Sequence, residues 1–321
     1  MVMNSEKSLL ALALLLTGLL AGAATQERPA KPNPEGRPRP PQPSEKPQRQ
    51  EPVSEVPLPE GARVFRDLEY VPGGHERQKL DLYLPKESRN SPLIVWVHGG
   101  AFRAGSKDRC PAVPYLREGY AVASINYRLS QHAIFPAQIE DCKAAIRWLR
   151  ANAAKHGIDA QRIGVWGSSA GGHLAAMLGT AGDVKEFEIG ENLHVSSRVQ
   201  AVCDWFGPTD FTRMNKAGSS MDHDAPDSPE SQLIGGPVQQ HKERAARANP
   251  ITFVSQNDPP FLIMHGDLDP LVPMNQSELL NEALGKAGVD VSFHVIKGAG
   301  HGFGGPEITK RVREFFGKHL K

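Results

Sequence analysis

The segment Arg162-Ile163-Gly164-Val165-Trp166-Gly167-Ser168-Ser169-Ala170-Gly171-Gly172-His173-Leu174 decides how this chain of 321 residues folds. It begins as an apolar run typical of a buried strand, breaks at small residues, and continues as a helix-forming run to Leu178. Ser169 stands at the centre of a Gly-x-Ser-x-Gly pattern with Gly167 and Gly171. We therefore expect a tight strand-to-helix turn that strains the backbone of Ser169 and pushes its side chain outward.

Such a turn makes Ser169 a candidate nucleophile. The helix that follows aims free N–H groups and the positive end of its dipole at the turn, and the N–H of Ala170 can stabilise an oxyanion. The pentapeptide alone also fits a glycine-rich turn with solvated serines, because short motifs match by chance. The segments after the other predicted strands decide between the two interpretations.

Three further polar segments directly follow predicted strands, where a doubly wound sheet places its ligands. They are His98-Gly99-Gly100-Ala101-Phe102, His265-Gly266-Asp267-Leu268-Asp269-Pro270-Leu271-Val272-Pro273 and Gly298-Ala299-Gly300-His301-Gly302-Phe303. Together with the serine turn they supply a nucleophile, an acid and a base in the order Ser, Asp, His. A serine hydroxyl needs an imidazole to take its proton, and the imidazole needs a carboxylate to hold its tautomer. The joint occurrence predicts a catalytic triad.

From about residue 62 to the last residue, the chain resembles the α/β-hydrolase superfamily. Within it, the chain is similar to the secreted esterase and lipase group that includes hormone-sensitive-lipase-like enzymes and acetyl and feruloyl esterases. The resemblance rests on the three segments above, on Gly-x-Ser-Ala-Gly-Gly, and on Asp204-Trp205-Phe206-Gly207-Pro208-Thr209-Asp210, all in order. It departs at Ala101, where the fuller His-Gly-Gly-Gly motif has glycine; backbone donors need no side chain, so the expected role is kept.

The resemblance implies roles for individual residues. Ser169 would be the nucleophile, His301 the general base and acid, and Asp269 the orienting carboxylate, with Asp267 as the rival acid. The expected oxyanion hole consists of the N–H groups of Gly100, Ala101 and Ala170. The candidate substrate-binding residues, which as single aromatic residues also fit a core, are Trp205, Phe206 and Phe303.

Other polar residues near these motifs are expected to be structural. His98 and His173 should support their loops by hydrogen bonds, and Asp204 should bond the serine loop or be a buried, satisfied carboxylate. The segment Met221-Asp222-His223-Asp224 with Asp227 lacks the supporting spacing of a metal site, so we expect a flexible, solvated lid there. We expect no metal and no cofactor.

Strand-like and helix-like patterns alternate along the chain. This alternation predicts an α/β-hydrolase fold: a mostly parallel sheet, entered through an antiparallel start, with helices on both faces and a short polar lid insertion at residues 207–249. Besides the serine turn and its helix, the predicted strands are 78–84, 93–97, 120–125, 163–166, 199–206, 260–265 and 291–296. The other predicted helices are 135–152, 275–288 and 306–319.

The N-terminal 60 residues are not expected to belong to the fold. Residues 1–23 resemble a secretory signal peptide, because an apolar run too short to span a bilayer comfortably precedes Ala21-Gly22-Ala23; an uncleaved anchor is the alternative. Residues 24–60 are crowded with proline and form a predicted disordered linker. The catalytic domain is then 61–321, and the protein is secreted or periplasmic with no stable membrane anchor.

Composition narrows the possible partners. The formal net charge is +1 and no basic block occurs, so a nucleic-acid partner is not expected. Three cysteines, Cys110, Cys142 and Cys203, exclude a disulfide scaffold, while one bridge between two of them stays open.

These observations predict a secreted serine carboxylesterase that hydrolyses short-acyl (acetyl) or aromatic-acyl (feruloyl) esters through an acyl-enzyme. The substrate would be a small-molecule or polysaccharide ester, because residues 207–249 are mostly polar and offer no broad apolar face for a lipid chain. The alternatives are a lipase, a peptidase or amidase of the same fold, and a non-catalytic binding protein.

Overall fold

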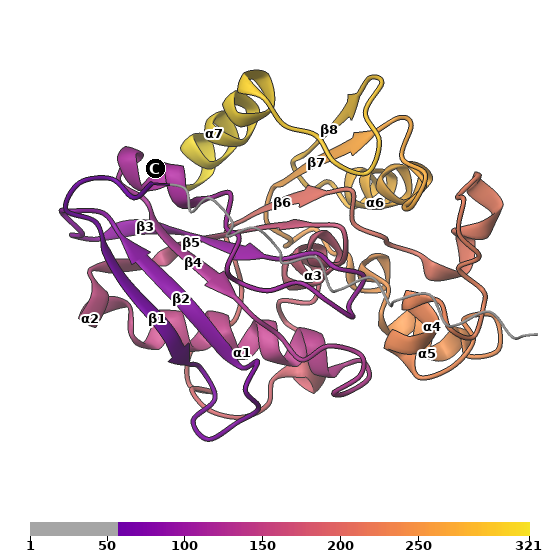
Figure 1. The fold of residues 1–321 in the computed structure, drawn as a ribbon, viewed down its shortest axis with the longest axis horizontal. Coiled ribbons are helices and arrows are strands. Elements are labelled where there is room, and N and C mark those ends of the chain that lie inside the picture. The colour runs from indigo at the N-terminus through magenta and orange to yellow at the C-terminus, as the bar shows by residue number, and fades with distance from the viewer. Residues whose placement is uncertain (1–56) are drawn as a thin grey trace, which may run out of the picture. The chain divides into compact units, whose positions relative to one another are not determined.

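An eight-stranded sheet runs through the part of the chain that the computed structural model describes, residues 57–321 (Figure 1). The strand order is β1-β2-β4-β3-β5-β6-β7-β8; β2 pairs antiparallel with β1 and β4, and the other pairings are parallel. The strands are β1 (Arg63–Glu69), β2 (Lys79–Leu84), β3 (Ser91–Val97), β4 (Ala121–Ile125), β5 (Ile158–Ser168), β6 (Ala201–Trp205), β7 (Phe261–Gly266) and β8 (Val291–Ile296). The predicted signal peptide and most of the predicted linker lie outside the described residues.

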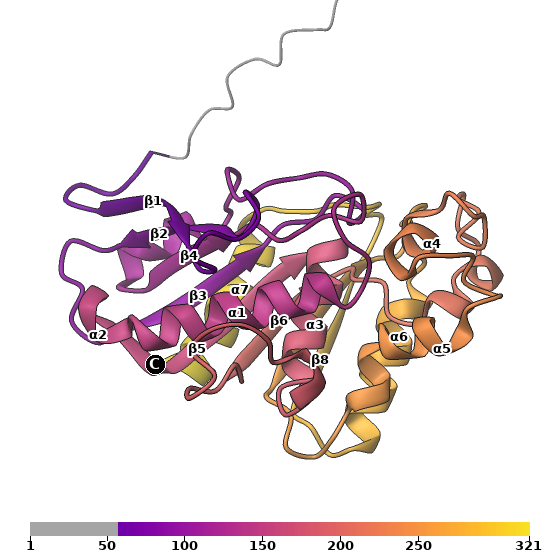
Figure 2. The ribbon, with the colours of Figure 1, turned by 90° about the horizontal axis from the view of Figure 1, so that it is seen from below.

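Helices cover both faces of the sheet (Figure 2). Apolar side chains of α1 (Ala137–Ala151), α3 (Ala170–Thr180) and α6 (Asn275–Lys286) belong to one core cluster. Those of α7 (Pro306–Leu320) and the 3-10 helix η1 (Val113–Glu118) belong to a second cluster. This layered arrangement confirms the predicted α/β-hydrolase fold.

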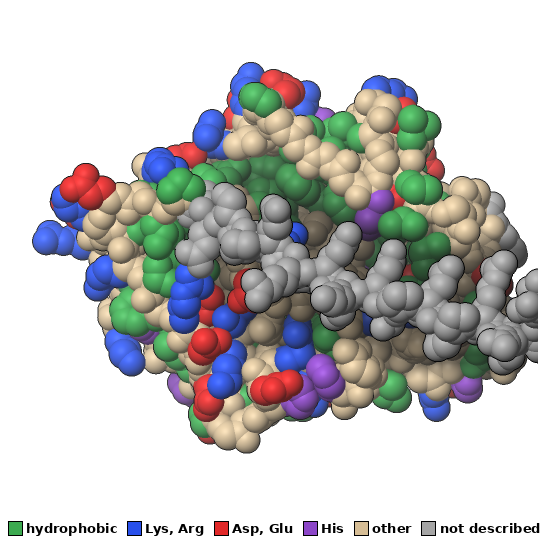
Figure 3. Space-filling model, in the orientation of Figure 1, with side chains coloured by type: hydrophobic (Ala, Val, Ile, Leu, Met, Phe, Trp, Pro, Cys, Tyr) green, Lys and Arg blue, Asp and Glu red, His purple; other side chains and the backbone are tan. Residues whose placement is uncertain are grey.

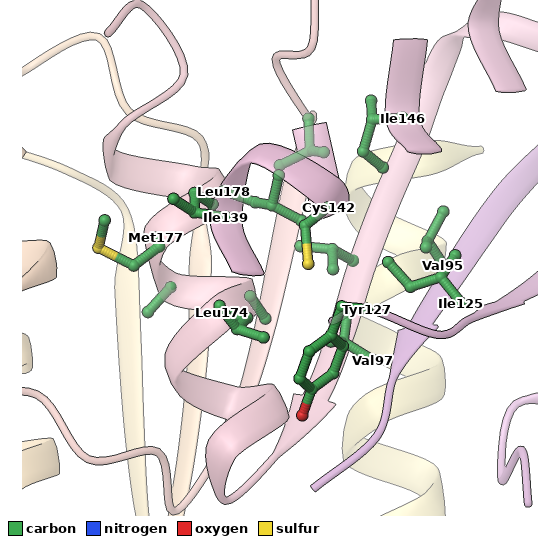
Figure 4. Packing of buried hydrophobic residues seen from close by; sticks show 14 of the residues in the cluster. Val95, Val97, Ile125, Tyr127, Ile139, Cys142, Ile146, Leu174, Met177 and Leu178 are labelled. Carbon is green, nitrogen blue, oxygen red and sulfur yellow. The ribbon is translucent and has the colours of Figure 1, made fainter. Parts of the chain in front are cut away.

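The central strands are apolar because both of their faces are covered. Every residue of β3 is buried, as expected for a strand in the middle of a parallel sheet. Figure 4 shows the packing on one face, where Val95 and Val97 of β3 lie near Cys142 of α1 and Leu174 of α3. This packing fixes the carboxyl ends of the central strands, from which the candidate site is built.

Local expectations differ from the structure in two strands. β1 was not predicted; its residues are half-buried or exposed, as in an edge strand, so no continuous apolar run marks it. β5 begins at Ile158, five residues before the predicted start. Residues 159–162 are partly buried or exposed and mostly polar, so no apolar run marks this part of the strand. The shorter helical elements are α2 (Ala153–His156), η2 (Lys185–Phe187) and η5 (Pro250–Phe253).

The insertion at residues 207–249 is more ordered than expected. It contains η3 (Phe211–Arg213), η4 (Asn215–Ala217), α4 (Pro229–Ile234) and α5 (Lys242–Arg247). Seven of its apolar residues are buried in the first core cluster: Phe211, Met214, Leu233, Ile234, Val238, Ala245 and Ala248. These residues are scattered along the sequence but meet in space, which the polar composition of the insertion did not indicate.

Two further properties concern the described residues as a whole. Cys110, Cys142 and Cys203 are all buried and carry free thiols, so none of the bridges left open by the sequence is formed. Within residues 57–321, we find no helix with both the length and the apolar character required to cross a bilayer.

Candidate active site

Ser169 occupies the sharp turn between β5 and α3, with φ 54° and ψ −124°. Its neighbours must be small. A Cβ on Gly167 would lie 2.0 Å from the carbonyl oxygen of Gly171, and a Cβ on Gly171 would lie 2.0 Å from that of Val97. Strand and helix therefore approach so closely that only glycine fits on either side, and the serine backbone is held in the strained conformation that the motif predicts.

Three side chains from distant parts of the chain form a hydrogen-bonded row at this turn. Nε2 of His301 lies 3.0 Å from Oγ of Ser169. Nδ1 of His301 lies 2.8 Å from Oδ2 of Asp269. The serine follows β5, the aspartate follows β7 and the histidine follows β8, so the row depends on three parallel strands ending at one edge.

The Asp269 carboxylate is enclosed by donors. Its Oδ1 accepts hydrogen bonds from the backbone N–H groups of Leu271 (2.9 Å) and Val272 (3.0 Å). Nε2 of His265 lies 3.3 Å from Oδ2. Burial raises the pKa of the Asp269 carboxyl, but the hydrogen bonds from His265 and His301 outweigh burial and hold it well below its usual range. The group is therefore an anion at neutral pH, as a carboxylate that orients an imidazole must be.

Asp267, the rival acid, faces elsewhere. It accepts a hydrogen bond of 2.6 Å from the N–H of Gly298 and pairs with Nζ of Lys297 at 3.2 Å. These contacts tie the loop after β7 to the turn after β8. The structure thus places Asp269, and not Asp267, beside His301.

The three residues expected to donate to an oxyanion line one cavity of about 440 Å³ with Ser169 and His301. The N–H groups of Gly100 and Ala101 have no acceptor within residues 57–321. Ala170 is the first residue of α3, so its N–H has no acceptor inside the helix. Gly100 (φ 117°) and Ala101 (φ 54°) both adopt left-handed backbone conformations. These free donors beside Ser169 suit a developing negative charge.

His98 supports the loop that carries these donors. Its Nδ1 donates to the carbonyl oxygen of Gly99 at 2.7 Å, and its Nε2 accepts from Arg77 at 3.1 Å. The ring stacks on Tyr127, whose hydroxyl donates to the carbonyl oxygen of His98. Burial lowers the pKa of His98 to about 4, so the ring stays neutral and keeps this pattern. This is the structural role expected from the sequence.

His173 and Asp204 lie beneath the serine turn. His173 donates from Nδ1 to the carbonyl oxygen of Pro208 at 2.9 Å, which is the expected supporting bond. Asp204 does not bond the serine loop; its Oδ1 accepts from the N–H of Gly207 at 3.0 Å, and its Oδ2 has no partner. Burial raises the pKa of Asp204 to about 6. The serine loop is bonded instead through the N–H of Ser169 to the carbonyl oxygen of Trp205.

Of the three aromatic residues predicted to bind substrate, one lines the cavity and two do not. Phe206 lines the cavity, and its ring centroid lies 4.7 Å from that of His301. Trp205 and Phe303 pack against each other with their ring planes tilted by 48° and their centroids 4.9 Å apart, and they are not among the cavity-lining residues. They are partly buried on the α7 side of the sheet, where Figure 3 shows a hollow lined by hydrophobic side chains below α7.

The insertion supplies cavity-lining residues that sequence reasoning missed. They are Pro208, Met221, His223, Pro229 and Glu230. The expectation of a solvated segment is wrong for His223, which is 1% exposed and bonded to Glu230. Ser228-Pro229-Glu230 has the composition of a helix start, and in the structure Ser228 caps α4. This pattern would have located the helix in the sequence, but not the residues that the helix contacts. Nowhere in the described residues are three or more His, Cys, Asp or Glu side chains arranged to hold a metal ion.

This sheet order, with a serine elbow after β5 and polar loops after β7 and β8, defines an α/β-hydrolase. More narrowly, the chain belongs to the BD-FAE family, whose model matches residues 80–284.

Individual relatives agree with this assignment. The chain is 32% identical over 255 residues to esterase LipQ of Mycobacterium tuberculosis, covering 74% of this chain and 56% of LipQ. It is 37% identical to a solved truncated carbohydrate esterase from gut microbiota. The match has a TM-score of 0.75 and covers 80% of this chain and 95% of the esterase. An acetyl ester-xyloside bifunctional hydrolase from Caldicellulosiruptor lactoaceticus is 29% identical. This match has a TM-score of 0.61 and covers 75% of this chain and 85% of the hydrolase. The chain spans little more than half the length of the first curated relatives.

Proposed function

We propose that this protein is a serine carboxylesterase that works through an acyl-enzyme. The observation that carries the proposal is the row of Ser169, His301 and Asp269, with contacts of 3.0 Å and 2.8 Å. A serine, a neutral imidazole and an ionised carboxylate in this order are the groups that nucleophilic acyl transfer requires.

Each group has a defined task in the proposed reaction. Nε2 of His301 takes the proton of Ser169 as Oγ attacks the ester carbonyl, and the N–H groups of Gly100, Ala101 and Ala170 stabilise the oxyanion. The imidazolium then gives its proton to the leaving alcohol, and Asp269 balances its charge. His301 then takes a proton from a water molecule that attacks the acyl carbonyl. As the bond between the acyl carbon and Oγ of Ser169 breaks, His301 gives this proton to Oγ and the acid is released.

We propose that the substrates are esters of short acyl groups, such as acetyl, or of compact aromatic acyl groups, such as feruloyl, on carbohydrates. The names of two similar proteins, a carbohydrate esterase and an acetyl ester-xyloside hydrolase, support this substrate class. The cavity of about 440 Å³ is of the size that small ligands occupy. Phe206 in its wall, with Trp205 and Phe303 beside it, offers a surface on which an aromatic acyl group would stack.

We further propose that the protein acts outside the cytoplasm. The support is the signal-peptide pattern of residues 1–23, followed by a proline-rich segment that suits a spacer.

The esterase proposal is tested by mixing the purified protein with p-nitrophenyl acetate and following release of p-nitrophenol in the first turnover. An acyl-enzyme predicts covalent acetylation of Ser169, detected by mass spectrometry of the quenched reaction, and a burst when deacylation is slower than acylation. A protein that binds the ester without releasing p-nitrophenol would be a binding protein and would contradict the proposal.

A further inference from the structure

The carboxylate of Glu230 stands in the wall of the cavity that holds Ser169, although protein encloses nearly all of its side chain. The residue is 4% exposed and lines the cavity together with Ser169 and His301. Its Oε2 lies 2.9 Å from Nδ1 of His223. Its Oε1 has no hydrogen-bond partner within the described part of the chain. A nearly buried carboxylate therefore keeps one oxygen free where a substrate would bind.

His223 holds this carboxylate in place. Its Nδ1 donates to Glu230, and its Nε2 lies 3.0 Å from the carbonyl oxygen of Leu271 and 2.8 Å from Oγ of Ser219. A carboxylate and a carbonyl both need a donor, so the imidazolium, with an N–H at each nitrogen, fits this environment. Burial lowers the pKa of His223, but the hydrogen bond and charge of Glu230 outweigh it and raise the pKa above its ordinary value. An imidazole that donates from one nitrogen to a carboxylate and from the other to a carbonyl makes a pair without net charge with that carboxylate.

The backbone around the pair is also fixed. Ser228 accepts a hydrogen bond from the N–H of Ser231 at 3.1 Å and donates to the carbonyl oxygen of His223 at 2.8 Å. Ser220 bonds the carbonyl oxygen of Pro270, in the loop that carries Asp269. Glu230, in the first turn of α4, is therefore oriented before a substrate arrives, which is the condition for a specific polar contact.

The residues of the cavity wall indicate which kind of hydrogen-bond donor a ligand would offer to Oε1 of Glu230. Oε1 of Glu230 is not sealed among protein atoms, and Glu230 lines the cavity. A ligand that fills the cavity and excludes water has to bring a donor of its own, because an acceptor left without a partner is costly. The pair carries no net charge, which favours a neutral hydroxyl over an ammonium group. The cavity lining contains no Lys or Arg, so nothing there would pair with an acidic ligand. An acetyl group carries no donor, so in an acetyl ester the hydroxyl has to belong to the alcohol part.

We propose that Glu230 is a specificity residue whose Oε1 accepts a hydrogen bond from a hydroxyl group on the alcohol part of the substrate. The inference rests on the proposed esterase function and narrows it to esters of polyhydroxylated alcohols, such as sugars. His223 is a positioning residue in this arrangement, because it acts through Glu230.

The test compares two acetate esters of secondary ring alcohols: a monoacetate of methyl xyloside, which has free hydroxyl groups, and cyclohexyl acetate, which has none. Glu230→Gln in the full chain should lower kcat/KM for the sugar ester at least about tenfold, since a hydrogen bond to a charged group is stronger than one to a neutral group. The same change should alter kcat/KM for cyclohexyl acetate less than about twofold. Glu243→Gln, at an exposed residue of α5, is the matched control and should change neither.

The ratio of the two rates decides the inference. An equal loss on both esters would make Glu230 purely structural, and no loss on either ester would show that it contacts no hydroxyl. In both cases the ratio is unchanged, which overturns the proposal. If circular dichroism shows that Glu230→Gln does not fold, Glu230→Asp, which withdraws the carboxylate by one methylene, is measured for the same change in ratio. A wild-type protein inactive on the sugar ester, on cyclohexyl acetate and on p-nitrophenyl acetate would instead contradict the esterase function itself, and with it this inference.

Discussion

Asp269 lies 2.8 Å from the imidazole of His301, although 32 residues separate them in the chain. The carboxylate also accepts two backbone hydrogen bonds from its own loop, so its position does not depend on the histidine alone. Such a carboxylate is suited to hold one tautomer of the ring and to balance its charge when the ring is protonated.

Replacing this carboxylate by an amide tests its role. Asp269→Asn should leave the protein folded but disfavour the reactive tautomer of His301, lowering kcat by a factor on the order of 10⁴. Asp267→Asn should cost far less, because Asp267 bonds Gly298 and Lys297 instead. The measurement is kcat on p-nitrophenyl acetate for both variants, and similar losses would leave the acid unassigned.

Replacing Ser169 and replacing its neighbour Ser168 by alanine should have very different effects on kcat. Ser169→Ala removes the hydroxyl that lies 3.0 Å from His301 and should lower kcat by several orders of magnitude, leaving the residual rate that binding and the oxyanion hole supply. Ser168→Ala should be mild, because Ser168 ends β5 and the hydrogen bond to the imidazole is made by Ser169. Steady-state rates of the two variants decide the assignment, which would be reversed if Ser168→Ala proved the more damaging change.

Acid should destabilise the protein through a buried histidine whose pKa is lowered, His173. Burial lowers the pKa of His173 to about 4, from 6.5 for the free side chain. Below pH 6.5 His173 is protonated in the unfolded chain, whereas in the folded chain it becomes protonated only near pH 4. The free energy of unfolding therefore falls as the pH falls between these two values. From pH 7 to pH 5 we expect a loss of roughly 2 kcal/mol from this site.

Urea unfolding of the wild type and of His173→Gln at both pH values measures this contribution. The variant should lose roughly 2 kcal/mol less than the wild type between pH 7 and pH 5. His194→Gln, at an exposed position, should follow the wild type. A variant that loses as much stability as the wild type would show that His173 is protonated in the folded state.

The value of kcat/KM should fall as the acyl chain of the ester becomes long. The cavity has a volume of about 440 Å³, and its wall includes His223 and Glu230 as well as Phe206 and Met221. Part of a long chain would therefore lie against polar groups or in solvent, where it gains less than the about 0.8 kcal/mol that each fully buried CH₂ contributes. We expect kcat/KM for p-nitrophenyl esters to be highest at acetate or butyrate and to fall at octanoate and palmitate. A maximum at octanoate or beyond, or activation on emulsions, would favour a lipase.

The N-terminal segment should be dispensable for catalysis. We expect exported protein to begin near Ala24 and limited proteolysis to trim it to about residue 60 with unchanged kcat/KM, because residues 24–60 lack the apolar residues needed for a core. N-terminal sequencing and an assay of the trimmed protein provide the measurement. Loss of activity on trimming would mean that this segment contributes to the domain.

Much of the fold and the place of the candidate site could be predicted because they depend on local patterns. Apolar runs located β3, β4, β6, β7 and β8 closely, while the edge strand β1, with half-buried residues, left no such pattern. The glycines around Ser169 predicted the elbow, since only that residue fits where a Cβ would strike a carbonyl oxygen. The motifs after β5, β7 and β8 predicted a shared site, since parallel strands place their carboxyl ends at one edge.

The sequence by itself therefore determined the sheet, the elbow and the candidate groups, because each is encoded within a few neighbouring residues or by the order of the strands. The tertiary structure alone decided which groups meet. It placed Asp269 and not Asp267 beside His301, moved Trp205 away from the cavity, and buried His223 between Glu230 and Leu271. The reason is that these contacts depend on how non-periodic loops pack against one another, and the partners of a side chain in such a loop come from parts of the chain that no local pattern connects.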